Sequence, residues 1–268
     1  DGDMEAQIAT DAIVAVFDHG INADVLFESG NVRLFAAGDP ISLDGVDYNG
    51  DARSLRFSPS GGLRAGTPYE VRISSAVGGP KRIGDYTWKF STPVPDLDST
   101  EPRDGDMEVQ IATDAIVAVF DHGVNADLLF QSDNVHLFAA GDAISLEGVD
   151  YNGDTRTLRF SPSGGLRAGT PYEVRVSSAV GGPKRSGDYT WKFSTPIPDL
   201  DLTEPRAGDL GVKIATDAIV AVFDHGVNAD VLLTPDNVRL LAAGDPISLE
   251  GIDYNGDSRT LRFSPSGG

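Results

Sequence analysis

Apolar and polar side chains alternate along several short stretches of this chain, with a period of two residues. These stretches are residues 32–36, 54–58, 69–74 and 86–91. In the third of them, Tyr69, Val71 and Ile73 alternate with charged residues. Such alternation is typical of antiparallel strands that have one face in a core and the other in solvent. Two sheets of this kind must pack together to bury their apolar faces, so the pattern predicts an all-β sandwich.

Turn and cap signals separate the predicted strands. Residues 12–17 form an apolar run rich in β-branched side chains and predict a strand. Residues 45–57 predict a hairpin in which Asn49 and Gly50 supply the positive φ angles of a tight turn. A single helical turn is expected over residues 23–27, with Asn22 as its N-cap.

The whole pattern recurs with a period of 103 residues. The segment Ile8–Gly20 is repeated letter for letter at Ile111–Gly123 and at Ile214–Gly226. A unit of about 100 residues is large enough to bury its own core. With about seven short strands per unit, we expect a tandem array of immunoglobulin-like antiparallel β-sandwiches. The predicted domains are residues 1–97, 98–200 and 201–268, the third incomplete because it lacks the C-terminal strands.

Two segments rich in proline and acidic residues connect the units. They are Thr92–Pro102 and Thr195–Pro205. Paired prolines favour an extended and fairly stiff connection. Because the chain starts and stops inside a repeat, we expect it to be part of a longer array.

The second unit carries several motifs in a fixed order. These are Glu101-Pro102, Gly105, Ala115–Asp121, Leu166–Tyr172 and Tyr189–Thr195. Their order resembles the bacterial Ig-like domain of S-layer and other bacterial surface proteins. Tyr172 is expected to enter the core and to hydrogen-bond near the Gly169-Thr170 corner, as tyrosine corners do in sandwiches. At Asp121-His122-Gly123 the chain departs from the family, which more often has a Ser-Glu-Pro-like turn, and this changes one loop. The resemblance implies an extracellular or cell-surface location.

Charge and cysteine content exclude several classes of protein. The formal net charge is −20, from 41 acidic and 21 basic residues. A negative field of this size repels phosphate backbones, so nucleic acid is not an expected partner. The sequence has no cysteine, which excludes disulfides. It also has no apolar run of about 18 residues, so no membrane span is expected.

Three of the four histidines follow an aspartate, at Asp18-His19, Asp121-His122 and Asp224-His225. An Asp–His pair can supply a general base, but no nucleophile or second carboxylate accompanies these pairs at a fixed spacing. We therefore interpret them as polar turns after core strands. The fourth, His136, corresponds to arginine in the other two units. No catalytic, cofactor-binding or metal-binding residue is predicted.

Two acidic patterns resemble calcium sites. Residues 47–51 resemble the start of a calcium loop, but Ala52 and Ser58 stand where an EF-hand has glycine and glutamate, so a hairpin is favoured. The connecting segments carry more carboxylates, and calcium bound there would stiffen the array. Those carboxylates belong to Asp96, Asp98, Glu101, Asp104, Asp106, Asp199, Asp201, Glu204 and Asp209. The solvated acidic linker is the favoured interpretation.

Some apolar side chains are predicted to face outward. If Ile13, Ala15 and Phe17 face the core, Val14 and Val16 do not, and a lateral contact between arrays is one use for such a face. Phe35 and Phe138 are also predicted to point outward, whereas Trp88 and Trp191 are predicted to point inward. The partners expected from these patterns are other copies of the chain or surface components.

The favoured function is a non-enzymatic structural or adhesive shaft or filament of a bacterial cell surface. A first alternative is a self-assembling extracellular fibre, in which the incomplete third domain is completed by strand addition from a neighbouring chain. A second alternative is an accessory module of a secreted enzyme. The near identity of the copies favours an array, since a module of an enzyme is expected as a lone or divergent copy.

Overall fold

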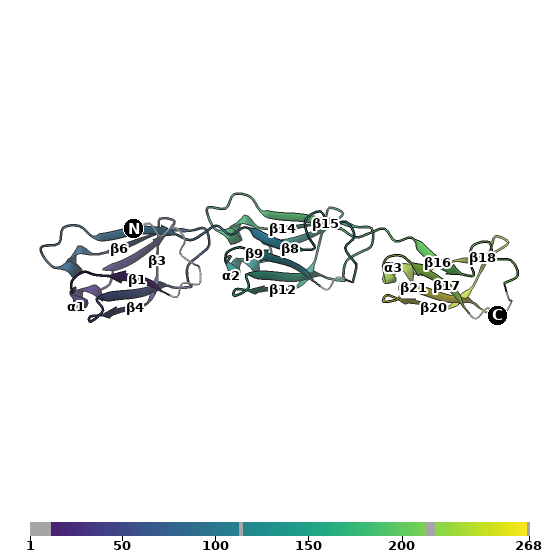
Figure 1. The fold of residues 1–268 in the computed structure, drawn as a ribbon, viewed down its shortest axis with the longest axis horizontal. Helices are drawn as coiled ribbons and strands as arrows, with labels where there is room; N and C mark the ends of the chain where they lie inside the picture. Colours follow the sequence, from purple (N-terminus) through teal and green to yellow (C-terminus); the bar gives the residue numbers. More distant parts are fainter. Residues whose placement is uncertain (1–11, 113–114, 213–217, 267–268) are drawn as a thin grey trace.

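The computed structural model describes residues 12–112, 115–212 and 218–266. Three β-rich units follow one another along the long axis of the molecule (Figure 1). We refer to them as the first, second and third repeats. The antiparallel sandwich fold predicted from the alternating pattern is confirmed.

The first repeat contains two sheets. One has the strand order β1-β5-β4 and the other β3-β2-β6-β7. The elements are β1 (Ile13–Val16), α1 (Ala23–Leu26), β2 (Val32–Ala36), β3 (Asp39–Ile41), β4 (Leu43–Asn49), β5 (Ser54–Pro59), β6 (Pro68–Ile73), the 3-10 helix η1 (Ser75–Gly78) and β7 (Tyr86–Ser91). Leu34, Leu55, Phe57, Val71 and Ile73 are fully buried between the sheets, as their alternation predicts.

The second repeat has the same arrangement with one further strand. Its sheets have the orders β12-β13-β9-β8 and β11-β10-β14-β15. The elements are β8 (Leu97–Glu101), β9 (Ile116–Phe120), α2 (Ala126–Leu129), β10 (Val135–Ala139), β11 (Asp142–Ile144), β12 (Leu146–Asn152), β13 (Thr157–Pro162), β14 (Pro171–Val176), η2 (Ser178–Gly181) and β15 (Tyr189–Ser194). Trp191 is buried, and Tyr172 stacks on Phe193 with 5.1 Å between ring centroids.

The third repeat has a four-stranded sheet of order β16-β17-β21-β20 and a two-stranded sheet, β18-β19. The elements are β16 (Leu200–Glu204), β17 (Ile219–Phe223), α3 (Ala229–Leu232), β18 (Leu240–Ala242), β19 (Asp245–Ile247), β20 (Leu249–Asn255) and β21 (Thr260–Pro265). Among its described residues, the buried apolar side chains are Leu261 and Phe263.

The β4–β5 turn differs from the predicted tight turn. Gly50 and Asn49 do not take positive φ angles; Arg53 does, at 50°. The Oδ1 atom of Asn49 accepts a hydrogen bond from the Ala52 N–H group, at 2.9 Å. The Arg53 guanidinium also donates to the Asp18 carbonyl. The side chain of Asn49 thus closes a loop of four residues, and the two-residue prediction was wrong.

Part of each predicted linker is a strand, β8 in the first and β16 in the second. β8 pairs with β9, with Leu97 opposite Phe120 and Glu101 opposite Val117. β16 pairs with β17 in the same way. Strand pairing therefore makes the C-terminal half of each acidic connection an edge strand of the following sandwich. The predicted domain bounds remain predictions.

Candidate functional site

The Asp–His pairs lie in bends at the end of each repeat that faces the preceding one. Each imidazole Nδ1 atom lies 3.1–3.2 Å from the carboxylate of the aspartate before it. The His19 side chain is 87% exposed, whereas His122 is 32% and His225 28% exposed. These positions agree with the interpretation of the pairs as polar turns. His122 and His225 are less exposed than His19, and both lie where two repeats meet.

The linker carboxylates are spread among backbone partners. Asp104 Oδ1 accepts from the Lys192 N–H group at 2.8 Å, and Asp106 Oδ2 accepts from the Arg103 N–H group at 2.9 Å. Within the described ranges, no three histidine, aspartate or glutamate side chains form a group that could hold a metal ion. The calcium hypothesis therefore gains no support from the described part of the chain.

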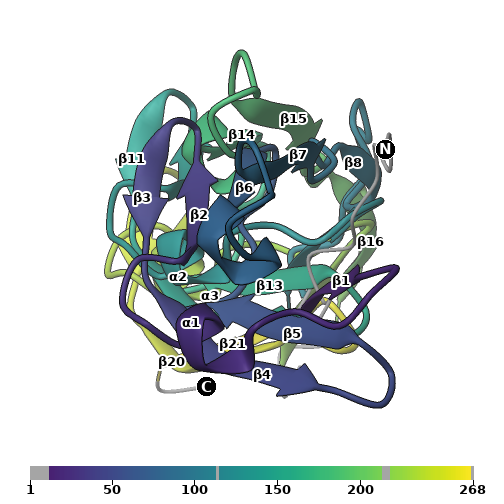
Figure 2. The same cartoon turned by 90° about the vertical axis from the view of Figure 1, so that its left-hand side faces the viewer.

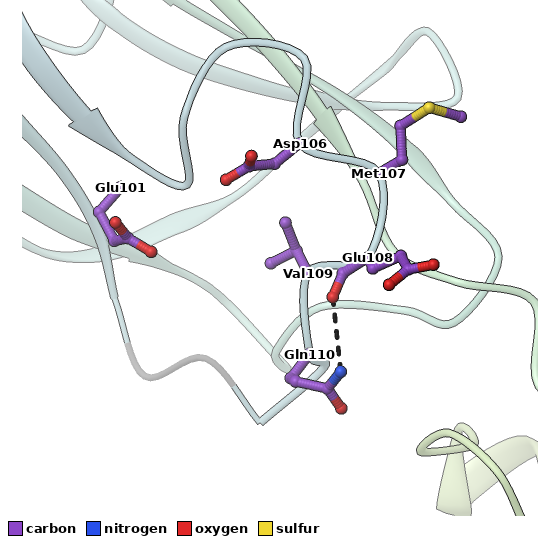
Figure 3. Close-up of a pocket in the computed structure, with 6 residues that line it drawn as sticks. All are labelled: Glu101, Asp106, Met107, Glu108, Val109 and Gln110. Atoms are coloured by element: carbon purple, nitrogen blue, oxygen red, sulfur yellow. Dashed lines mark hydrogen bonds between the residues drawn. The ribbon is translucent and has the colours of Figure 1, made fainter.

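A shallow depression lies beside the loop that follows β8. Glu101, Asp106, Met107, Glu108, Val109 and Gln110 line it. Its close-up shows one hydrogen bond among these residues, donated by the Gln110 side-chain Nε2 to the Glu108 backbone carbonyl at 3.4 Å, and Met107 points away from Glu101 (Figure 3). The lining combines carboxylates with apolar groups and offers no obvious nucleophile.

One side-chain hydrogen bond between neighbouring repeats occurs at both junctions. Asn125 Oδ1 accepts a hydrogen bond from the Ala65 N–H group at 2.8 Å. At the next junction, Asn228 Oδ1 accepts from the Ala168 N–H group at 2.9 Å. These asparagines stand at the N-cap positions of α2 and α3, yet their side chains make no cap bond. Asn22, the predicted N-cap residue, stands at the N-cap position of α1, but its side chain makes no cap bond either, so the predicted side-chain cap was wrong. At the two junctions the corresponding side chain binds the preceding repeat.

The donor N–H group sits in a corner that its own repeat holds rigidly. The Tyr69 hydroxyl accepts from the Arg64 N–H group at 2.7 Å, and Tyr172 does the same for Arg167 at 2.6 Å. The Thr92 hydroxyl accepts from the Thr67 N–H group and donates to the Arg64 carbonyl. The predicted tyrosine corner is confirmed. It positions the Ala65 and Ala168 N–H groups, which donate to the asparagine of the next repeat.

Backbone approaches backbone in the first junction. A Cβ atom on Gly182 would lie 1.8 Å from the Ala65 carbonyl oxygen, and one on Gly66 would lie 2.3 Å from that of Gly181. Both Gly66 and Gly182 have positive φ angles, 55° and 85°. Only glycine fits such a contact, since any side chain would push the two repeats apart.

The segment between the repeats is also anchored to the second repeat. The Tyr189 hydroxyl donates to the Pro95 carbonyl at 2.9 Å. Arg185 lies over the Tyr189 ring, 3.9 Å from its centroid, and pairs with Asp96 at 3.1 Å. Burial raises the pKa of Tyr189 to about 12, so the hydroxyl keeps its proton and remains a donor.

Asp121, which follows β9, also binds the connecting segment at Asp96. Its Oδ1 atom accepts from the Asp96 N–H group at 2.7 Å, and its own N–H group donates to the Asp96 carbonyl. Burial alone would raise the pKa of Asp121, but the Asp96 N–H bond and His122 outweigh it and lower the pKa. Asp224 and Asp199 make the same pair of bonds at the next junction. The hydrogen bond from Asp199 is the main reason that the pKa of Asp224 is lowered.

The sequence contained signals for this interface that composition did not expose. Asn125, Gly182 and Tyr189 have counterparts at Asn22, Gly79 and Tyr86. Each reads as an ordinary cap, loop or core residue within one repeat. Their shared role appears only when two repeats are placed end to end.

Comparison with known proteins gives one family and several distant structures. Residues 93–195 match the family model of the bacterial Ig-like domain. A chimeric tandem of titin Z1Z2 is 15% identical, covering 62% of this chain and 83% of its own, with a TM-score of 0.23. The N-terminal part of the bacterial S-layer protein SbsC is 11% identical, covering 69% of this chain and 41% of its own, with a TM-score of 0.27. Chicken CNTN1 FN1-FN3 domains are 12% identical, covering 98% and 83%, with a TM-score of 0.22.

At these TM-scores the structural likeness supports no functional conclusion. Among curated proteins, no sequence matches the chain. None of the helices in the described part of the chain is long and apolar enough to cross a membrane.

Proposed function

We propose that this chain, whose residues 93–195 belong to the bacterial Ig-like domain family, is a non-enzymatic structural shaft of a bacterial cell surface. The Ig-like domain is a non-catalytic type of module, and its repetition with a period of 103 residues favours a role in reach rather than chemistry. Such a shaft would serve adhesion or form part of a filament.

The observation that carries this proposal is the repeated junction. Equivalent asparagines, Asn125 and Asn228, accept a hydrogen bond from the corner N–H group of the preceding repeat, at 2.8 and 2.9 Å. The aspartate pairs, Asp96–Asp121 and Asp199–Asp224, are also repeated. Contacts that recur with the sequence repeat favour one fixed angle between neighbours, so that each added repeat extends a rod in a regular way.

Small-angle scattering of the whole chain tests the shape. We expect a rod-like particle whose distance distribution shows maxima at one and at two repeat spacings. Replacing both Asn125 and Asn228 with alanine should blur the second maximum, because the repeats then reorient. Asn22→Ala is the matched control, since Asn22 is exposed and contacts no other repeat in the described structure. A compact particle, or equal blurring by the control, would refute the proposal.

The surface location is tested separately. Antibodies raised against the chain should label intact cells that produce the native protein. Labelling that requires permeabilised cells would contradict a surface shaft while leaving the rod shape intact.

A further inference from the structure

Cations predominate on the outer face of the sheet β3-β2-β6-β7 and on its counterpart β11-β10-β14-β15. The inward side chains of these strands fill the core, and the alternate ones point to solvent. We call this outward surface the arginine face. It consists of Arg33, Phe35, Glu70, Arg72 and Lys89 in the first repeat, and of His136, Phe138, Glu173, Arg175 and Lys192 in the second.

The arginine face of the first repeat holds more cations than its own carboxylate can neutralise. Arg33 lies directly opposite Arg72 in the β2–β6 pair, an arrangement of like charges that destabilises a sheet. Glu70 already pairs with Arg72 at 2.5 Å and with Lys89 at 3.4 Å. Within the described part of the chain, Arg33 forms no ion pair. This face therefore favours the approach of further carboxylates.

Carboxylates predominate on the outer face of the opposite sheet. In the second repeat, one row crosses all four strands and has a carboxylate at each end: Glu101, Val117, Arg159 and Asp150. The third repeat has the same row, formed by Glu204, Val220, Arg262 and Asp253. Glu147 and Glu250 lie on the same surface. We call these two rows, with Glu147 and Glu250, the acidic face.

Successive repeats turn the same sheet to the same side of the molecule. Figure 2 looks along the long axis, with β6 and β14 in the upper part and β5, β13 and β21 in the lower part. Figure 1 agrees, because β4, β12 and β20 all lie along the lower side. The arginine faces of neighbouring repeats therefore line one side of the rod, and the acidic faces line the opposite side.

We propose that the arginine face binds the acidic face of a second copy of this chain, so that rods pack side by side. Because the two faces lie on opposite sides of one copy, the contact is heterologous and can be repeated from rod to rod into a layer. The half-buried Phe35 and Phe138 lie on the arginine face, and half-buried valines lie on the acidic face. Contact would thus also remove apolar surface from water. The inference rests on the rod of the proposed function.

Position, and not overall charge, supplies the attraction. Each chain carries a net charge of −20, so two copies repel each other at long range. At an ionic strength of about 0.15 M, charges more than about 8 Å apart are largely screened, whereas ion pairs in contact are screened less. Both faces recur with the repeat, so neighbouring repeats of two rods can engage together. A weak contact in each repeat is then strengthened by its multiplicity.

Sedimentation equilibrium of the full chain at about 0.15 M ionic strength tests the contact. We expect the mean molecular mass to rise with concentration up to about 1 mM. The double variant Lys89→Glu/Lys192→Glu reverses one charge on the arginine face of each of two repeats, at side chains that are 77% and 69% exposed. It should weaken association about tenfold. Lys81→Glu/Lys184→Glu is the matched control, since both lysines are exposed in turns outside the two faces. It makes the same change in net charge and should leave association unchanged.

A charge swap separates lost recognition from a damaged fold. Glu147→Lys/Glu250→Lys makes the acidic face more basic and should also weaken self-association. An equal mixture of this variant with Lys89→Glu/Lys192→Glu should associate again, because carboxylates then face lysines across the contact. A chain that stays monomeric up to about 1 mM would overturn the proposal. So would equal weakening by the Lys81→Glu/Lys184→Glu control, or a mixture that fails to associate. A rod-like but monomeric chain would overturn the lateral contact alone and leave the proposed shaft in place.

Discussion

The end face of the second repeat and the end face of the first repeat have nearly the same sequence but different surroundings. In the second repeat, Gly181 and Gly182 are buried by the preceding repeat, whereas Gly78 and Gly79 in the first are not. Asn125 receives a hydrogen bond from the repeat before it, and Asn22 receives none in the described structure. The difference separates what each residue does for its own sandwich from what it does for its neighbour. For each interface residue of the second repeat, the counterpart in the first repeat therefore serves as a control.

The largest expected effect comes from Gly182→Ala. The added Cβ atom would lie 1.8 Å from the Ala65 carbonyl oxygen, so the first and second repeats must separate. Gly79→Ala is the control, because Gly79 has nearly the same backbone angles, φ 80° and ψ −179°, but no atom within 4 Å of the added carbon. Both variants carry the strain of a residue that favours glycine, and Gly182→Ala should cost about 1–3 kcal/mol more.

Spin labels on the first and second repeats measure the outcome. The distance distribution between them should broaden and shift for Gly182→Ala, and stay as in the unchanged chain for Gly79→Ala. An unchanged distribution in both variants would show that the backbone contact does not set the angle between the repeats.

Asn125→Ala is expected to have the next largest effect. It leaves the Ala65 N–H group without its acceptor in a partly buried position, at a cost of about 1–2 kcal/mol. The helix itself should survive, because the Asn125 side chain makes no cap bond. Thermal unfolding compares this variant with Asn22→Ala, for which we expect a much smaller change. Equal losses in the two variants would place the role of this asparagine within its own repeat.

The fold was predictable from the sequence to a much greater extent than the interface. The alternation in residues 69–74 and 86–91 places β6 and β7 correctly, because side-chain burial within one sandwich has a period of two. Trp191 is buried as predicted. Phe138 lies beneath Arg175, 4.7 Å from its guanidinium carbon to the ring centroid. That outward position was predicted, whereas its arginine cover was not.

The interface was missed because its partners are far apart in the chain and unremarkable locally. Ala65 and Asn125 are 60 residues apart, and no periodicity links a corner of one sandwich to a cap position in the next. The sequence predicts an extended linker here because paired prolines favour a stiff connection. The prolines at 93, 95 and 102 flank β8, so the strand between them is free to pair along the edge of β9. The predicted lateral contact through Val14 and Val16 remains a prediction.

Tyr189→Phe should have a smaller effect than Asn125→Ala. It removes the hydrogen bond to the Pro95 carbonyl and leaves the ring in the core, at a cost of about 1 kcal/mol. Tyr86→Phe should cost much less, because its hydroxyl has no partner among the described residues. Denaturation followed by the fluorescence of Trp191 in one variant and of Trp88 in the other reports each repeat. A similar loss in both would mean that the hydroxyl matters within the sandwich, independently of the connecting segment.

The smallest expected effect is that of acid on Asp121. Its pKa in the folded chain is lowered from 3.8, so the unfolded chain binds the proton more tightly than the folded chain. The stabilisation is therefore present above about pH 4 and is lost as the pH falls through the lowered pKa. Because Asp121 is 42% exposed, solvent screening limits the effect to a few tenths of a kcal/mol. Asp121→Asn keeps an oxygen acceptor for the Asp96 N–H group and removes the titration, so its unfolding temperature should change less between pH 5 and pH 3 than that of the unchanged chain. Asp18→Asn should also flatten the profile, through the loss of its pairing with His19, but it should leave the distance between the repeats unchanged at every pH. If acid alters that distance equally in the Asp121→Asn variant and in the unchanged chain, the carboxylate of Asp121 does not hold the junction.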